Sequence, residues 1–83
     1  MFEATAFDEY QKWIKNDKKL SLKIGLLIQD TLKNPFIGLG KPEPLKGNFQ
    51  GYWSRRISDE HRLIYKVTDT SIIIASCYSH YTK

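Results

Sequence analysis

The residues best suited to chemistry lie within residues 41–65, which read KPEPLKGNFQGYWSRRISDEHRLIY. This stretch contains all three arginines of the chain, Arg55, Arg56 and Arg62, within a span of eight residues. Arginine is well suited to binding phosphate, because its planar guanidinium donates two parallel hydrogen bonds to one anion. The spacing therefore predicts a surface that handles phosphate groups.

Glu43 is the candidate general base. It lies between Pro42 and Pro44, which restrict the backbone and hold the carboxylate on an extended segment. An ionised carboxylate beside cations can accept a proton from a hydroxyl group. His80 is the natural acid partner, because histidine exchanges its proton near neutral pH.

Together these groups fit metal-free cleavage of RNA by its own 2′-hydroxyl. Glu43 would take the hydroxyl proton, and His80 or Tyr81 would protonate the leaving 5′-oxygen, giving a 2′,3′-cyclic phosphate and a 5′-hydroxyl. Three cations would offset the charge that develops on the phosphate: Lys46, Arg56 and Arg62. No metal ion or other cofactor is expected. On their own, however, these residue types favour a basic RNA-binding module over a nuclease.

Composition limits the alternatives. A chain of 83 residues with 41% hydrophobic residues predicts one globular domain over residues 1–83, and the net charge of +4 favours an anionic partner. Cys77 is the only cysteine, so no intrachain disulfide can form, and we expect a buried, inert thiol there. There is neither a signal-peptide pattern nor an apolar run of about 18 residues, which predicts a cytoplasmic protein without a membrane segment.

Two helices are expected ahead of the catalytic stretch. A short strand over residues 2–5 precedes a first helix that starts near Ala6, with Thr5 as its cap. Asp17 is expected to cap the second helix, which ends at Asn34 because Pro35 disfavours helical backbone before it. The apolar stripe of this second helix consists of Leu20, Ile24, Leu27, Ile28 and Leu32.

Four strands are expected after the helices, over residues 42–46, 52–57, 61–68 and 71–81. The predicted fold class is α+β: two antiparallel N-terminal helices pack on one face of a mainly antiparallel sheet, in the order β-α-α-β-β-β-β.

Alternation along the strands assigns side chains to the two faces of this sheet. The face expected under the helices consists of Trp53, Ile57, Leu63, Tyr65, Val67, Ile73, Ala75 and Cys77. The open face is expected to collect Arg56, Arg62, Lys66, Ser76, Tyr78 and His80. It would also expose Ile72 and Ile74 to a second subunit or a bound peptide. Arg55 has core parity, so it should reach an edge or pair with a carboxylate, and His61 is interpreted as structural.

Four short motifs carry a family resemblance: K-P-E-P-L-K at residues 41–46, W-S-R-R-I at 53–57, E-H-R-L-I-Y at 60–65 and C-Y-S-H-Y at 77–81. With them the chain resembles, essentially from end to end, the YoeB/Txe branch of the RelE/ParE superfamily of toxin–antitoxin toxins. The resemblance implies a RelE-like fold and a small ribosome-dependent mRNA endonuclease that cuts codons in the ribosomal A site and stops translation.

The resemblance also implies site residues and partners. The family's functional positions fall at Glu43 as the base, Lys46, Arg56, Arg62, and the terminal pair His80 and Tyr81. The implied partners are a cognate antitoxin of the YefM/Axe type, the ribosome with its A-site mRNA, and a second copy in a homodimer. Two alternatives stay open: a ParE-like poison of DNA gyrase on the same fold, and a non-catalytic module that binds ribosomal RNA.

Overall fold

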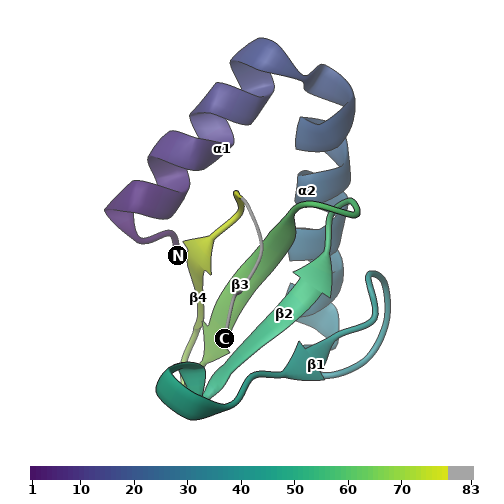
Figure 1. The fold of residues 1–83 in the computed structure, drawn as a ribbon. Coiled ribbons are helices and arrows are strands. Elements are labelled where there is room, and N and C mark those ends of the chain that lie inside the picture. Colours follow the sequence, from purple (N-terminus) through teal and green to yellow (C-terminus); the bar gives the residue numbers. More distant parts are fainter. Residues whose placement is uncertain (79–83) are drawn as a thin grey trace.

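Two helices cover one face of a four-stranded antiparallel sheet in the computed structural model, which describes residues 1–78 (Figure 1). The elements are α1 (Ala4–Asn16), α2 (Lys18–Lys33), β1 (Glu43–Pro44), the 3-10 helix η1 (Gly47–Phe49), β2 (Tyr52–Arg56), β3 (Arg62–Val67) and β4 (Ile72–Ser76). The strands lie side by side in sequence order, each antiparallel to the next. This confirms the predicted α+β fold with both helices on one face.

The N-terminal end differs from the prediction. The helix α1 begins at Ala4 and its N-cap is Glu3, so a start near Ala6 with Thr5 as the cap is wrong. The expected first strand is reduced to a single parallel bridge between Phe2 and Ile74. The helix takes the residues that follow this bridge, which leaves no length for a strand.

The second helix has the predicted ends. The Asp17 side chain accepts a hydrogen bond from the backbone N–H of Leu20 at 3.1 Å, which satisfies one of the unpaired donors of the first turn. The helix stops at Lys33, and Asn34 is extended because it precedes proline.

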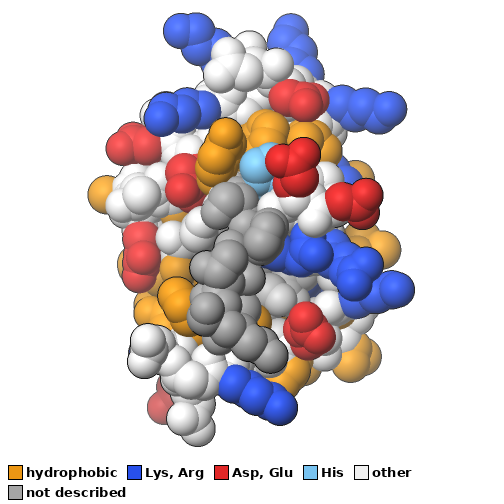
Figure 2. Space-filling view, viewed as in Figure 1, with side chains coloured by type: hydrophobic (Ala, Val, Ile, Leu, Met, Phe, Trp, Pro, Cys, Tyr) orange, Lys and Arg blue, Asp and Glu red, His pale blue; other side chains and the backbone are white. Residues whose placement is uncertain are grey.

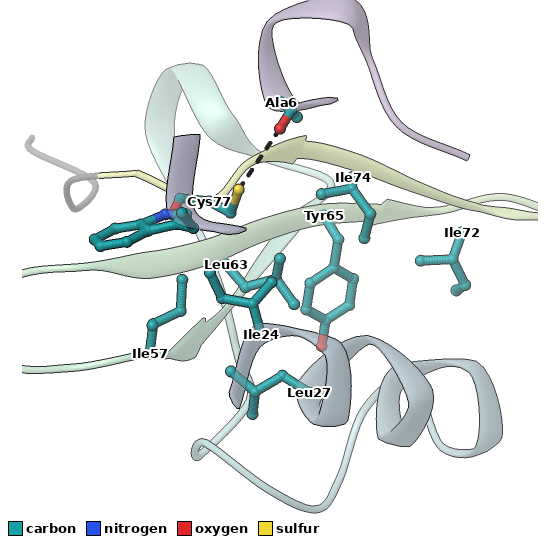
Figure 3. Close-up of a cluster of buried hydrophobic side chains, with 10 residues drawn as sticks. Ala6, Ile24, Leu27, Ile57, Leu63, Tyr65, Ile72, Ile74 and Cys77 are labelled. Carbon is teal, nitrogen blue, oxygen red and sulfur yellow. Dashed lines mark hydrogen bonds between the residues drawn. The ribbon is translucent and has the colours of Figure 1, made fainter. Parts of the chain in front are cut away.

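The core lies between the helices and the sheet (Figure 3). Ile24 and Leu27 of α2 belong to one buried cluster with Leu63 and Tyr65 of β3. The cluster also contains Ala6 and Trp13 of α1, and Ile57, Ile72, Ile74 and Cys77. Of the core positions predicted for the strands at residues 52–57 and 61–68, Ile57, Leu63 and Tyr65 are in the cluster, and Trp53 and Val67 pack against it while partly buried.

The prediction for β4 was wrong. Ile72 and Ile74 were expected on the open face, but they are 8% and 1% exposed and belong to the core cluster. Ile73 and Ala75, expected in the core, are only partly buried. The two isoleucines therefore provide no exposed surface for a partner.

A β-bulge explains the reversal. Tyr65 pairs with Ile74 while the preceding residue, Ile64, pairs with Ser76, so Ala75 is an extra residue in β4. An extra residue exchanges the two faces for everything on one side of it. Counting back from the buried Cys77 without the bulge places each residue before Ala75 on the wrong face.

The last strand is also shorter than predicted. It ends at Ser76, so Cys77 and Tyr78 lie beyond the sheet pairing. His80 and Tyr81, expected at the end of this strand, lie outside the described residues. Within residues 1–78, no helix is long and apolar enough to cross a membrane.

Candidate active site

Glu43 lies on the face of the sheet opposite the helices. It pairs with Ser54 of β2, whereas its neighbour Pro44 pairs with Trp53, which packs against the core. Because neighbouring residues of a strand point to opposite faces, the Glu43 side chain is directed away from the helices. Its side chain is exposed, as a base that must reach a substrate requires.

Two arginines share this open face with Glu43. Arg56 of β2 and Arg62 of β3 are direct cross-strand partners, and Arg56 lies two residues beyond Ser54, the partner of Glu43. Direct partners have Cβ atoms about 5 Å apart, and diagonal neighbours are about 7–8 Å apart. Glu43, Arg56 and Arg62 therefore form a row across three strands, which we call the Glu–Arg–Arg row. Figure 2 shows basic side chains gathered on this face.

Like charges directly opposite each other destabilise a sheet. Arg56 is exposed and Arg62 half-buried, and the one ion pair within residues 1–78 joins Arg55 to Asp30. Neither arginine of the row therefore forms an ion pair with a carboxylate of that part of the chain. An anion between them would relieve their repulsion, which is the electrostatic arrangement of a phosphate site.

Arg62 is held in place by the turn between β2 and β3. Its Nη1 donates hydrogen bonds to the backbone oxygens of Ser58 at 2.6 Å, His61 at 3.0 Å and Asp59 at 3.3 Å. These contacts fix one side of the guanidinium against the turn. Binding an anion with the other side would then need little further ordering of the side chain.

Arg55 has a different role from its neighbour. It is fully buried, and its Nη1 lies 2.6 Å from Asp30 Oδ2, which confirms that it pairs with a carboxylate. Its other donors reach the backbone oxygens of Asn34, Ile37 and Leu39, and the hydroxyl of Tyr65. The hydrogen bond from Arg55, and then that from the Leu39 N–H, hold the pKa of Asp30 below its usual value.

These contacts tie the loop that precedes Glu43 to the sheet. The backbone N–H of Arg56 donates to the Gly40 oxygen at 2.7 Å, so the loop is also bonded to β2 directly. Gly40 has a φ of +78°, and a Cβ there would lie 3.1 Å from the Arg56 nitrogen. Only glycine combines this backbone with so close an approach. These contacts fix the position of the loop and of β1 relative to β2.

Two lysines that were not predicted as site residues lie beside Arg56. A shallow hollow beside Arg56 is lined by Lys23 of α2 and Lys41, together with Leu26, Leu27, Leu39 and Gly40. Lys41 has a φ of +52°, an uncommon conformation for a residue other than glycine. The G-K-P sequence at residues 40–42 is the one local feature that could have suggested it.

The remaining predicted residues are placed less fully. Lys46 is exposed and follows β1 as the N-cap of η1, so no strand register aligns it with the row. His80 and Tyr81, the predicted acid residues, lie outside residues 1–78. Among residues 1–78, no three His, Cys, Asp or Glu side chains gather as a metal site requires.

His61 and Cys77 have the structural environments expected of them. The His61 ring lies 4.8 Å from the rings of both Trp13 and Tyr78. Cys77 is fully buried, and burial, together with the nearby Glu9 carboxylate, raises the pKa of its thiol to about 12. A thiol that stays protonated and inaccessible is not a nucleophile.

Comparison with known sequences gives one consistent family. Residues 2–81 match the model of the YoeB-like toxin of bacterial type II toxin-antitoxin systems. The toxin YoeB of Escherichia coli K12 is 55% identical over 76 residues, which cover 92% of this chain and 90% of that protein. The mRNA interferase toxin YafQ of the same organism is 39% identical over 59 residues, covering 71% of this chain and 62% of YafQ.

Solved structures agree with the sequence comparison. A YoeB/ParE toxin from Agrobacterium tumefaciens superposes with a TM-score of 0.93 at 43% identity, covering 98% of this chain and 96% of that one. YoeB from Staphylococcus aureus, solved as a dimer, gives 0.90 at 49% identity, and in a YoeB-YefM complex 0.90 at 48%. Both S. aureus matches cover 98% of this chain and 94% of theirs.

Proposed function

The chain belongs to the YoeB-like toxins of bacterial type II toxin–antitoxin systems, and we propose that it is a ribosome-dependent endoribonuclease that cleaves mRNA without a metal ion. The Glu–Arg–Arg row is the observation that carries this proposal. It brings an exposed carboxylate beside two cations on the open face of the sheet. Attack of a 2′-hydroxyl on the adjacent phosphodiester needs a base next to a phosphate-binding site.

In the proposed mechanism Glu43 removes the proton of the 2′-hydroxyl. Arg56 and Arg62 bind the scissile phosphate, and Lys46 adds a third positive charge as the phosphorus becomes pentacoordinate. His80 or Tyr81 donates a proton to the departing 5′-oxygen. A single positioned base or acid contributes about 10²–10⁴ in rate, so loss of either end of the site is expected to be severe.

The choice of mRNA as substrate rests on relatives rather than on the row itself. YafQ, a relative through 71% of this chain, is an mRNA interferase toxin. The ribosome is proposed as the partner that orders the message across the open face, because a shallow site cannot by itself hold a flexible strand in the geometry for in-line attack. Such a substrate places the protein's action in the cytoplasm.

We also propose an antitoxin partner and a homodimer. S. aureus YoeB, which is 48–49% identical, was solved both as a dimer and in complex with YefM. A YefM-like antitoxin is accordingly the expected binding partner of this chain, and its acidic groups would find cations on the open face.

Primer extension on a message, after the protein is produced in growing cells, tests the proposed function. New 5′ ends within translated codons are expected, and they should disappear when the same message lacks a start codon. Broken DNA with intact mRNA would instead indicate a gyrase poison. Arrested translation without new ends would indicate a non-catalytic ribosome-binding module. Either of these results would overturn the proposal.

A further inference from the structure

Residues on one face of α1 bind the chain where it leaves the sheet at the end of β4. Ala6, Glu9 and Trp13 are spaced three and four residues apart, so they lie along one side of the helix. All three contact Cys77, the first residue after β4. We call Ala6, Glu9 and Trp13 the α1 clamp.

The clamp replaces the sheet as the partner of the Cys77 backbone. The N–H of Cys77 donates to Glu9 Oε1 at 3.0 Å, and its carbonyl accepts from Trp13 Nε1 at 2.7 Å. The same Glu9 oxygen accepts from the Ser76 hydroxyl at 3.2 Å. Both backbone polar groups of Cys77 are therefore satisfied by side chains of one helix, as buried backbone requires.

The thiol provides a third point of attachment. Cys77 Sγ lies 3.6 Å from the Ala6 carbonyl oxygen, within the core (Figure 3). The ring of Tyr78, the next residue, packs against Trp13 at 5.4 Å. Position and direction of the chain are thus both fixed at residues 77 and 78.

The two predicted acid residues follow this anchor immediately. His80 is three residues after Cys77, and three extended residues span only about 10 Å. The place at which Cys77 is held therefore limits where an acid at position 80 or 81 can reach relative to the Glu–Arg–Arg row. A displacement of about 1 Å at a reacting group can cost up to about 100-fold in rate.

We infer that Glu9 and Trp13 are positioning residues: they act on RNA cleavage through the C-terminal acid residues, without touching the substrate. This inference rests on the proposed function. Neither residue is needed to explain phosphate binding by Arg56 and Arg62, which lie on β2 and β3. The clamp should therefore affect the chemical step and leave substrate binding unchanged.

The test uses the purified full chain on mRNA-programmed ribosomes. Glu9→Ala and Trp13→Phe each remove one hydrogen bond to Cys77, and each is expected to lower kcat by about 10- to 100-fold. Because binding is not involved, KM should stay within about twofold of the unsubstituted value. Glu9→Gln keeps an oxygen acceptor for the Cys77 N–H and should restore most of kcat.

Asp8→Ala is the matched control. Asp8 is the exposed carboxylate next to Glu9 on α1, so its removal makes the same change of charge away from the clamp. Unchanged kcat is expected for this variant. Thermal melting shows which variants are folded and can be compared. If one clamp variant does not fold, the other, which also lacks one hydrogen bond to Cys77, is used for the test.

A background without the acid residues separates positioning from general stability. In a His80→Ala/Tyr81→Ala chain, adding Glu9→Ala should cause no further loss in a single-turnover rate, because the groups that the clamp positions are gone. A full, additive loss there, or wild-type kcat for folded Glu9→Ala and Trp13→Phe, would overturn the inference. In the second case the unsubstituted chain still cleaves, so the proposed function would stand.

Discussion

Arg55 and Arg56 are neighbours in the chain, yet they take opposite roles because adjacent strand residues face opposite sides of the sheet. Arg55 is fully buried and donates hydrogen bonds to Asp30, Tyr65 and three backbone oxygens. Arg56 is exposed on the open face opposite Arg62. The W-S-R-R motif therefore combines one buried, structural arginine with one exposed arginine to which the proposed function assigns phosphate binding. Substitutions at the two positions should separate stability from activity.

Asp30 makes stability depend on acidity. Its pKa is lowered in the folded protein by Arg55, from an ordinary value of 3.8. The stabilisation is complete above the unfolded value and is lost as the pH falls through the lower folded pKa. Melting temperatures measured from about pH 6 down to about pH 3 should therefore fall more steeply for the unsubstituted chain than for Asp30→Asn. Parallel curves for the two chains would contradict this assignment.

Cys77 should be inert in the folded protein. Its thiol is fully buried and its pKa is raised to about 12, so almost no thiolate forms at pH 8. A thiol reagent such as DTNB should react with the chain only after denaturant is added. Cys77 is the only cysteine in the sequence, so the absorbance change reports on it alone. Rapid labelling of the native protein would show that this part of the core opens readily.

At the scale of the elements, the loop between α2 and β1 depends on Arg55. Its five hydrogen bonds need the fork of a guanidinium, and lysine has only three donors. Arg55→Lys leaves at least two acceptors unpaired, at about 1–3 kcal/mol each if they stay buried. We expect a fall in Tm on the order of 10 °C or more.

The matched control for this prediction is Arg56→Lys, the same substitution one residue later. Arg56 is exposed, and its side chain makes no salt bridge to a carboxylate within residues 1–78. Its Tm should stay within about 2 °C of the unsubstituted value, since surface substitutions change stability little. Equal falls in Tm for both variants would contradict the assigned difference between the two arginines.

The sequence predicted the elements whose signals are local. The end of α2 follows from Pro35, and its start follows from the Asp17 cap, which the structure confirms. The prediction of which β4 residues face the core was wrong because of the bulge at Ala75. This bulge arises from the pairing with β3, and the residue type at position 75 does not indicate it. The start of α1 was wrong because Glu3 serves as its N-cap without a side-chain hydrogen bond.

Part of the candidate site could also be predicted from the sequence. Alternation placed Arg56 and Arg62 on the open face correctly because β2 and β3 pair without a bulge. The face of Glu43 was not predicted; its pairing with Ser54 sets it. The α1 clamp was not predictable, because Glu9 and Trp13 meet Cys77 across more than 60 residues of sequence. No local pattern encodes a contact between elements at the two ends of a chain.

At the scale of the whole molecule, the two helices cover only one face of the sheet (Figure 1). Basic side chains gather on the opposite side (Figure 2). The strand register places the Glu–Arg–Arg row on that opposite side. With a net charge of +4, the chain as a whole attracts anions such as RNA.

The most direct test of the proposed activity is single-turnover cleavage of mRNA on programmed ribosomes by the unsubstituted chain and by Glu43→Gln. Glu43 is exposed, so the substitution should leave Tm unchanged, and Glu3→Gln provides an exposed control of identical chemistry. We predict products with a 2′,3′-cyclic phosphate and a 5′-hydroxyl, and a rate lowered about 10²–10⁴-fold by Glu43→Gln but not by Glu3→Gln. Cleavage by folded Glu43→Gln at the unsubstituted rate would contradict the assignment of Glu43 as the base.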